Sequence, residues 1–170
     1  MRDELLNEAM DLHTEHLLRL SYFYVQSWEV AEDIVQESFM AFYEKAAQYK
    51  GEASVKNYLR KIVINRCHDY LRKKKRWQLF LPFKNAKSAE QEVVLSNEKS
   101  ALLQAVMRLK EKYRETIILY YFEELSTVQI AELLGLNEST VRSRLKRARD
   151  ELKRYLNDHS EWEVLLHESV

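Results

Sequence analysis

The chain has 170 residues, with 27 Lys and Arg side chains against 27 Asp and Glu, and it holds two glycines, one proline and one cysteine. With only Gly51 and Gly135 available, it contains no GxGxxG motif and no P-loop, which excludes the familiar nucleotide-dependent enzymes. The single Cys67 excludes an internal disulfide, and no apolar run approaches the roughly 18 residues that a membrane span needs.

The scarcity of glycine and proline bears on the fold, because turns and hairpins use both residues and helix interiors exclude them. We therefore expect an all-α protein, and the length allows one domain or two smaller ones. The first residues, MRDELLNEAM, are acidic where an export signal has a basic and then an uninterrupted apolar segment. We expect a cytoplasmic protein.

The net charge of zero hides a strong segregation of charge along the chain. Residues 1–54 carry 4 basic and 11 acidic side chains, whereas residues 55–87 carry 11 basic and 1 acidic. Residues 88–137 carry 5 basic and 8 acidic side chains, and residues 138–154 carry 7 basic and 3 acidic ones. Residues 155–170 carry no basic and 4 acidic side chains. Two basic blocks separated by acidic ones indicate two separate contacts with a polyanion.

Hydrophobic periodicity predicts two helices near the start of the chain. The first covers residues 3–24, and its apolar stripe comprises Leu5, Leu6, Ala9, Leu12, His16, Leu20, Phe23 and Tyr24. Ser27 is placed to cap the second helix, and Gly51 ends that stretch. The apolar face of the second helix comprises Val30, Ile34, Val35, Phe39, Phe42 and Ala46.

A third helix is predicted from a cap at Ser54 to about Trp77. Its apolar face comprises Val55, Tyr58, Leu59, Ile62, Val63, Cys67 and Tyr70. Its other face is polar and comprises Arg60, Lys61, Asn65, His68, Arg72 and Lys75. Residues 78–95 hold the only proline and lose the periodicity, so we interpret them as an extended linker. The apolar LFLPF stretch either binds in a partner's groove or packs on its own domain.

A second helical unit begins at about Ser96. Its first two helices carry Leu102, Leu103, Val106 and Leu109, and then Tyr113, Ile117, Ile118, Tyr120, Tyr121 and Phe122. Ser126 and Gln129 form a capping-box pair, Gly135 provides a turn, and Asn137 is placed to cap the last helix. The apolar seam of that last helix comprises Val141, Leu145, Ala148 and Leu152.

Residues 126–149, STVQIAELLGLNESTVRSRLKRAR, have the form of a helix-turn-helix, in which the small Ala131 lets two helices cross closely. Opposite the seam lie Arg142, Ser143, Lys146 and Arg147, with Arg144 on the flank. A recognition helix offers such a surface to the DNA major groove. The alternative interpretation is a solvated basic face on an ordinary helix.

Longer stretches resemble one protein family. Residues 109–152, including TVRSRLKRAR, closely resemble region 4 of bacterial extracytoplasmic function sigma factors. AEDIVQESFMAFY at 31–43 resembles region 2.2, and YLRKIVINRCHDYLRKKKR at 58–76 resembles regions 2.3 and 2.4. The resemblance implies sigma region 2 over residues 1–77, the linker over 78–95 and sigma region 4 over 96–156, followed by a tail of unknown role at 157–170.

The resemblance also implies three sets of functional residues. Those that dock on the polymerase β′ clamp helices comprise Glu32, Asp33, Gln36, Glu37 and Met40. A second set recognises and melts the minus 10 element, and it comprises Asn57, Tyr58, Arg60, Lys61, Asn65, Arg72 and Lys75. The loop at 48–57 beside this set accepts a flipped base. Those that read the minus 35 element comprise Thr140, Arg142, Ser143, Arg144, Lys146 and Arg147. Without the family match, the first set would be interpreted as a solvated acidic face.

The implied function is an alternative sigma factor, not an enzyme. Its implied partners are RNA polymerase core, through the β′ clamp helices and the β flap, promoter DNA, and an anti-sigma factor of the kind that is often membrane-anchored. We expect no small-molecule substrate and no cofactor, because binding of the extruded strand can offset unstacking. We expect no metal either, because His13, Glu15 and His16 fit no strong ligand motif.

Two other functions remain as alternatives. The first is a conventional helix-turn-helix repressor or activator that acts without polymerase and uses its N-terminal half to dimerise or to sense a ligand. The third helix with Asn65 and its basic side chains speaks against it, because a dimerisation domain has no reason to carry them. The second, more distant alternative is a metal-dependent helical-bundle enzyme, but the chain has no E-x-x-H pair.

Overall fold

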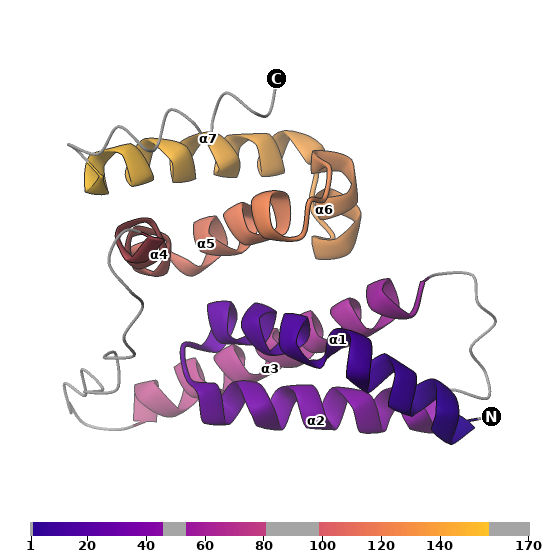
Figure 1. Cartoon of the computed structure of the whole chain (residues 1–170). Helices are drawn as coiled ribbons and strands as arrows, with labels where there is room; N and C mark the ends of the chain where they lie inside the picture. The colour runs from indigo at the N-terminus through magenta and orange to yellow at the C-terminus, as the bar shows by residue number, and fades with distance from the viewer. Residues whose placement is uncertain (1, 46–53, 81–98, 157–170) are drawn as a thin grey trace. The chain divides into compact units, whose positions relative to one another are not determined.

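The structure, a computed structural model, describes residues 2–45, 54–80 and 99–156 (Figure 1). All regular secondary structure in these ranges is helical, which confirms the predicted all-α class. The chain divides into two compact units, Met1–Glu92 and Val93–Val170, as the prediction of two helical domains requires. Within the described ranges, no helix is both long enough and apolar enough to cross a bilayer.

The N-terminal unit consists of three helices, each of which packs against the other two (Figure 1). They are α1 (Arg2–Val25), α2 (Trp28–Lys45) and α3 (Val55–Phe80). The predicted caps are present, because Ser27 Oγ accepts the Val30 N–H at 3.4 Å and Ser54 Oγ accepts the Asn57 N–H at 3.2 Å. Residues 46–53, with the predicted helix-ending Gly51, lie outside the described residues.

The core of this unit is formed by one apolar stripe from each helix. It includes Ala9, Leu17, Leu20, Ile34, Val35, Phe39, Phe42, Leu59, Val63, Ile64 and Cys67. The expected stripe on α1 was wrong at Leu12, which is 66% exposed, whereas Leu17 is fully buried. The two residues point about 140° apart on a helix, so the stripe that fits α2 and α3 includes Leu17 and leaves Leu12 in solvent.

Arg60 was expected on the polar face of α3, but only 7% of it is exposed. The reason is helical phase. Arg60, Val63, Ile64 and Cys67 follow the i, i+3, i+4, i+7 spacing of a single face, and the other three are buried core residues. Arg60 therefore belongs to the interior side of α3.

The C-terminal end of α3 is longer than the sequence indicated. The predicted linker begins at residue 78, but α3 continues to Phe80, and the first residue that cannot continue a helix is Pro82. Every side chain from Arg72 to Gln78 is exposed, so these last turns lie outside the core of the unit. The rest of the predicted linker, and the tail at 157–170, lie outside the described residues.

The C-terminal unit is built around its last helix. Its elements are α4 (Lys99–Arg108), α5 (Glu111–Ile117), the π-helical turn η2 (Ile118–Phe122), α6 (Thr127–Leu134) and α7 (Glu138–Tyr155). Helices α4, α5 and α6 all contact α7 (Figure 1). The predicted seam of α7 is confirmed, because Val141, Leu145, Ala148 and Leu152 are all buried.

Two arginines that the sequence did not single out hold this unit together. The buried guanidinium of Arg114 donates to the carbonyls of Met107 at 3.2 Å and Leu109 at 3.3 Å, which satisfies acceptors at the end of α4. Arg149 donates to the Tyr121 hydroxyl at 2.9 Å, and its guanidinium lies 5.5 Å from the Tyr120 ring centre. Tyr120 and Tyr121 are half-buried, and their contacts with Arg149 join η2 to α7.

Candidate functional site

One side of α2 is apolar and buried, and the other carries acidic and polar side chains. The exposed side, which we call the acidic face, comprises Glu32, Asp33, Gln36, Glu37 and Met40. All five are exposed, and Met40 is exposed to 61%, which is high for a methionine. The acidic face therefore combines carboxylates with an accessible apolar side chain, a combination that suits a protein partner.

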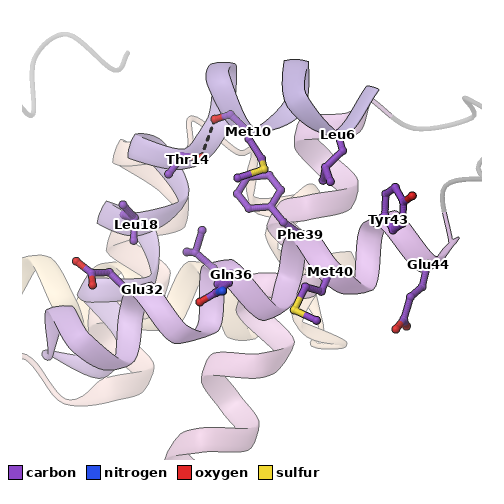
Figure 2. Close-up of a pocket in the computed structure, with 11 residues that line it drawn as sticks. Leu6, Met10, Thr14, Leu18, Glu32, Gln36, Phe39, Met40, Tyr43 and Glu44 are labelled. Carbon is purple, nitrogen blue, oxygen red and sulfur yellow. Dashed lines mark hydrogen bonds between the residues drawn. The ribbon is translucent and has the colours of Figure 1, made fainter. Parts of the chain in front are cut away.

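An apolar groove of about 520 Å³ lies next to this face, between α1 and α2 (Figure 2). Leu6, Met10 and Leu18 line it from α1, and Phe39 lines it from α2. Three members of the acidic face, Glu32, Gln36 and Met40, also line it. The acidic face and the groove are thus one continuous surface.

The acidic face is tied to α3 by an ion pair, in which the Arg66 guanidinium donates to the Glu37 carboxylate. The two side chains are 34% and 60% exposed, so water screens the pair. The pair holds one acidic side chain of α2 close to the helix that carries most of the basic residues of this unit.

The exposed side of α3, which we call the α3 basic face, brings together four of the predicted minus 10 residues. These are Lys61, Asn65, Arg72 and Lys75, all of them exposed. Asn57 is also exposed, whereas Tyr58 is half-buried, with its ring centre 6.0 Å from that of Phe42. Arg60 does not join them, because it is buried. Of the base-accepting loop predicted at 48–57, only residues from 54 onward are described.

The end of α3 adds functional candidates that the sequence analysis passed over. Lys73, Lys74 and Arg76 are exposed beside Arg72 and Lys75, and Trp77 is 70% exposed. The signal was present in the sequence as the unbroken basic run at 72–76, but the helical wheel assigned only two of its members to the outer face. Basic side chains around a helix, next to an exposed aromatic ring, suit phosphates and unstacked bases.

The helix-turn-helix prediction is confirmed in its local geometry. The Ser126 Oγ accepts the Gln129 N–H at 3.2 Å and the Gln129 side chain accepts the Ser126 N–H at 2.9 Å, which completes the capping box. Gly135 ends α6 in the left-handed conformation, with φ of 65°. Ala131 is buried at the predicted crossing position. Asn137 stands at the N-cap of α7, but its side chain makes no capping hydrogen bond.

On α7, four of the six predicted minus 35 residues lie on the side opposite the buried seam, and Thr140 and Arg144 lie toward its flanks. Arg142, Ser143, Lys146 and Arg147 are exposed, and Thr140 and Arg144 are half-buried. The pKa of the Tyr113 phenol is lowered, chiefly by interaction with the Arg147 side chain and also by nearby positive charge. Arg147 therefore lies close to a side chain of α5.

Glu138, which the sequence analysis did not single out, lies between α6 and the predicted recognition surface. One of its carboxylate oxygens accepts the Thr127 hydroxyl at 2.6 Å and two N–H groups of Arg142, from Nε at 3.1 Å and from Nη2 at 2.7 Å. These bonds lower the pKa of Glu138, and the hydrogen bond from the Thr127 hydroxyl is the largest single cause. The i, i+4 spacing of Glu138 and Arg142 is visible in the sequence, but the contact with Thr127 is not.

Comparisons with known proteins assign this arrangement to a family. Residues 10–77 match the family described as Sigma-70 region 2, and residues 99–152 match the family described as Sigma-70, region 4. The RNA polymerase sigma factor SigV of Bacillus subtilis is 32% identical over 142 residues, which cover 80% of this chain and 81% of SigV. The chain belongs to the extracytoplasmic function sigma factors of the sigma-70 family.

Other sigma factors are similar to this chain over most of its length. The ECF RNA polymerase sigma factor SigW of Bacillus subtilis is 28% identical over 166 residues, covering 89% of this chain and 88% of SigW. Among solved structures, the sigma factor RpoE, in a co-crystal with the anti-sigma factor NepR from Bartonella quintana, has a TM-score of 0.74 at 23% identity, over 93% of this chain and 99% of that one. The structural likeness supports the fold.

The family membership decides between the functions left open by the sequence. This sigma factor is an alternative initiation factor that directs RNA polymerase core to promoter DNA, and the repressor or activator alternative is not favoured. The α3 basic face belongs to the segment that matches region 2, and Thr127, Glu138 and Arg142 belong to the segment that matches region 4.

Proposed function

We propose that this sigma factor docks on RNA polymerase core through the acidic face of α2 and contacts promoter DNA through two separate basic surfaces. The α3 basic face would engage the minus 10 element, and the exposed side of α7 the minus 35 element. The observation that carries the proposal is the presence of all three surfaces in one chain, on three different helices whose opposite sides are buried.

The acidic face suits a polymerase contact because charge and apolar surface occur together there. Carboxylates such as Asp33 and Glu37 steer and orient a basic partner, whereas an exposed apolar side chain such as Met40 gains free energy when it is buried. The adjoining groove offers further apolar area to the same partner. We assign this docking to the β′ clamp helices, as the family resemblance implies.

The α3 basic face suits a DNA strand that is being opened. Lys61, Arg72 and Lys75 can neutralise phosphates, and Asn65 lies on the same exposed side as an amide able to read a base edge. The exposed Lys73, Lys74, Arg76 and Trp77 extend this surface. Capture of the extruded strand would offset the few kcal/mol that unstacking costs, so no cofactor is needed.

On this proposal, the N-terminal unit carries core binding and promoter melting, and the C-terminal unit carries minus 35 recognition together with the β flap contact. The chain would catalyse no reaction of its own, because phosphodiester chemistry belongs to the core enzyme. It would act in the cytoplasm, where the polymerase meets the chromosome.

Transcription in vitro tests the proposal. Purified bacterial core polymerase is incubated with the full chain and a fragmented genomic library, and transcript 5′ ends are mapped. We expect initiation at a discrete set of sites with shared upstream elements, in a manner dependent on the chain. Specific duplex binding by the chain alone, with no gain in initiation by core polymerase, would support the repressor or activator alternative.

We also propose control by an anti-sigma factor that covers the acidic face or the α3 basic face. RpoE in its co-crystal has NepR as such a partner, and CnrH, with a TM-score of 0.64 at 20% identity, was solved with the cytosolic domain of CnrY. Pull-down of cellular proteins with the full chain, followed by a transcription assay, tests this. The expected partner suppresses initiation and competes with core polymerase; a partner that leaves initiation intact would be of another kind.

A further inference from the structure

The three hydrogen bonds at Glu138 restrain one predicted minus 35 residue in a specific way. Arg142 is 69% exposed, yet its Nε and Nη2 both donate to Glu138 Oε1. A guanidinium has five N–H groups in a planar fork, and Glu138 engages the edge formed by Nε and Nη2. The other edge, formed by Nη1 and the remaining N–H of Nη2, takes no part in the contact with Glu138.

That second edge has the geometry that a guanine requires. Two parallel N–H groups of an arginine donate to O6 and N7 of guanine in the major groove, which is the commonest specific contact between proteins and DNA. Arg142 lies in the second turn of α7, and the N-terminal residues of a recognition helix are those that contact base edges. An arginine fastened along one edge loses less side-chain freedom when the other edge binds a base.

Thr127 restrains the Glu138 carboxylate, which in turn restrains Arg142. Its hydroxyl donates to the same Oε1 atom at 2.6 Å, and it comes from the first turn of α6, so Glu138 is held from a second helix. An isolated i, i+4 pair on a helix surface is weak and changes partners readily. The bond from α6 distinguishes Glu138 from such a pair, because it restrains the carboxylate independently of Arg142.

We propose that Glu138 is a positioning residue for promoter selectivity: it holds Arg142 in the orientation that reads one guanine of the minus 35 element and keeps its charge from nearby phosphates. The inference rests on the proposed function of α7 as the recognition helix. The inference makes a specific prediction about base selectivity. Loss of the Glu138 charge should weaken discrimination at one base pair while contact with DNA of any sequence is kept or strengthened.

The experiment uses the full chain assembled with core polymerase and a promoter library in which the minus 35 region is randomised. Bound sequences are compared for wild type, Arg142→Ala, Glu138→Gln and Thr127→Val, with Glu132→Gln as a control that removes one exposed carboxylate from α6. We expect the wild type to select guanine at one position, and Arg142→Ala and Glu138→Gln to lose about tenfold of that preference at the same position. Glu132→Gln should retain it.

A second measurement separates positioning from a merely structural role. The affinity of each holoenzyme for DNA of unselected sequence is measured against salt. An Arg142 released to a phosphate should steepen the slope of log K against log salt by about 0.9 in Glu138→Gln and Thr127→Val, whereas Arg142→Ala cannot gain this contact. Thermal unfolding of each variant identifies any that fails to fold, and Thr127→Val then provides the test if Glu138→Gln does not.

The outcomes are distinct. If Glu138→Gln and Thr127→Val select the same sequences as the wild type with equal strength, or lose affinity uniformly for all sequences, Glu138 does not position Arg142. If Arg142→Ala leaves the guanine preference intact, another side chain reads that base and the inference is wrong. If the wild-type holoenzyme selects no sequence at all, the proposed function fails together with the inference.

Discussion

The Arg66 guanidinium of α3 is paired with the Glu37 carboxylate of α2, so a residue of the acidic face is bound to the helix that carries the α3 basic face. Both side chains are partly exposed, and a pair of this kind contributes at most about 1 kcal/mol to stability. Removing the Glu37 charge should therefore affect partner binding much more than folding. This makes Glu37 a suitable probe of polymerase docking.

Charge reversal on the acidic face should weaken binding to core polymerase. We expect Asp33→Lys combined with Glu37→Lys to lower core affinity by at least about tenfold, because like charges brought together at an interface cost several kcal/mol. Titration of core polymerase against fluorescently labelled full chain measures the effect. Glu8→Lys is the matched control, since Glu8 is exposed on α1 and lies outside both the acidic face and the groove. An unchanged affinity for the double variant would mean that core docks elsewhere.

Lys146 is exposed on α7 opposite the seam, and its replacement by alanine should alter sequence preference. A base contact is worth about 1–3 kcal/mol of discrimination, so Lys146→Ala holoenzyme should bind promoters with different bases at one minus 35 position almost equally. Lys153→Ala, exposed in the last turn of the same helix, should leave the preference intact. An equal loss on every sequence would instead identify Lys146 as a phosphate contact.

Gly135 should be required for its backbone conformation alone. Its φ of 65° is unfavourable for residues with a Cβ, although a Cβ there would meet no atom within 4 Å. Gly135→Ala should therefore destabilise the turn by about 1 kcal/mol, and Gly135→Asn by less, because asparagine tolerates this conformation better. Native-state hydrogen exchange of α6 and α7 amides measures both. Equal protection in the alanine variant and the wild type would contradict the explanation.

The Glu138 carboxyl should titrate below its ordinary pKa in the folded chain, because Thr127 and Arg142 donate hydrogen bonds to the ionised form. A folded pKa below the unfolded one means that ionised Glu138 stabilises the fold above its ordinary pKa. That contribution is lost as the pH falls through the folded value. Thr127→Val and Arg142→Ala should each raise the pKa, since each removes a hydrogen bond to the ionised carboxylate. Carbon-detected NMR titration of this carboxyl measures both shifts, and equal midpoints in all three proteins would contradict the expectation.

Features encoded within a single helix or turn were predictable from the sequence. The Ser126–Gln129 capping box, the Gly135 turn and the buried seam of α7 were all expected at the residues where they occur. Each depends on local spacing, on one side-chain cap or on one backbone conformation, so a few adjacent residues determine it. The sets of polymerase-contacting and DNA-contacting residues came from family resemblance and stay predictions until their partners are tested.

What the tertiary structure decided is which side of each helix faces inward and which side chains meet across helices. Arg60 lies on the interior side of α3 because the stripe through Val63, Ile64 and Cys67 packs against α1 and α2. The apolar spacing of α3 indicates that stripe, but the burial of an arginine beside it follows only when the three helices pack together. The contact of Thr127 with Glu138 likewise requires α6 and α7 to cross. By itself, the sequence determined the all-α class, the side-chain caps at Ser27, Ser54 and Ser126, and the segregation of charge, because these follow from composition and local spacing. Burial and contacts between helices follow from packing, which exists only when the helices are assembled.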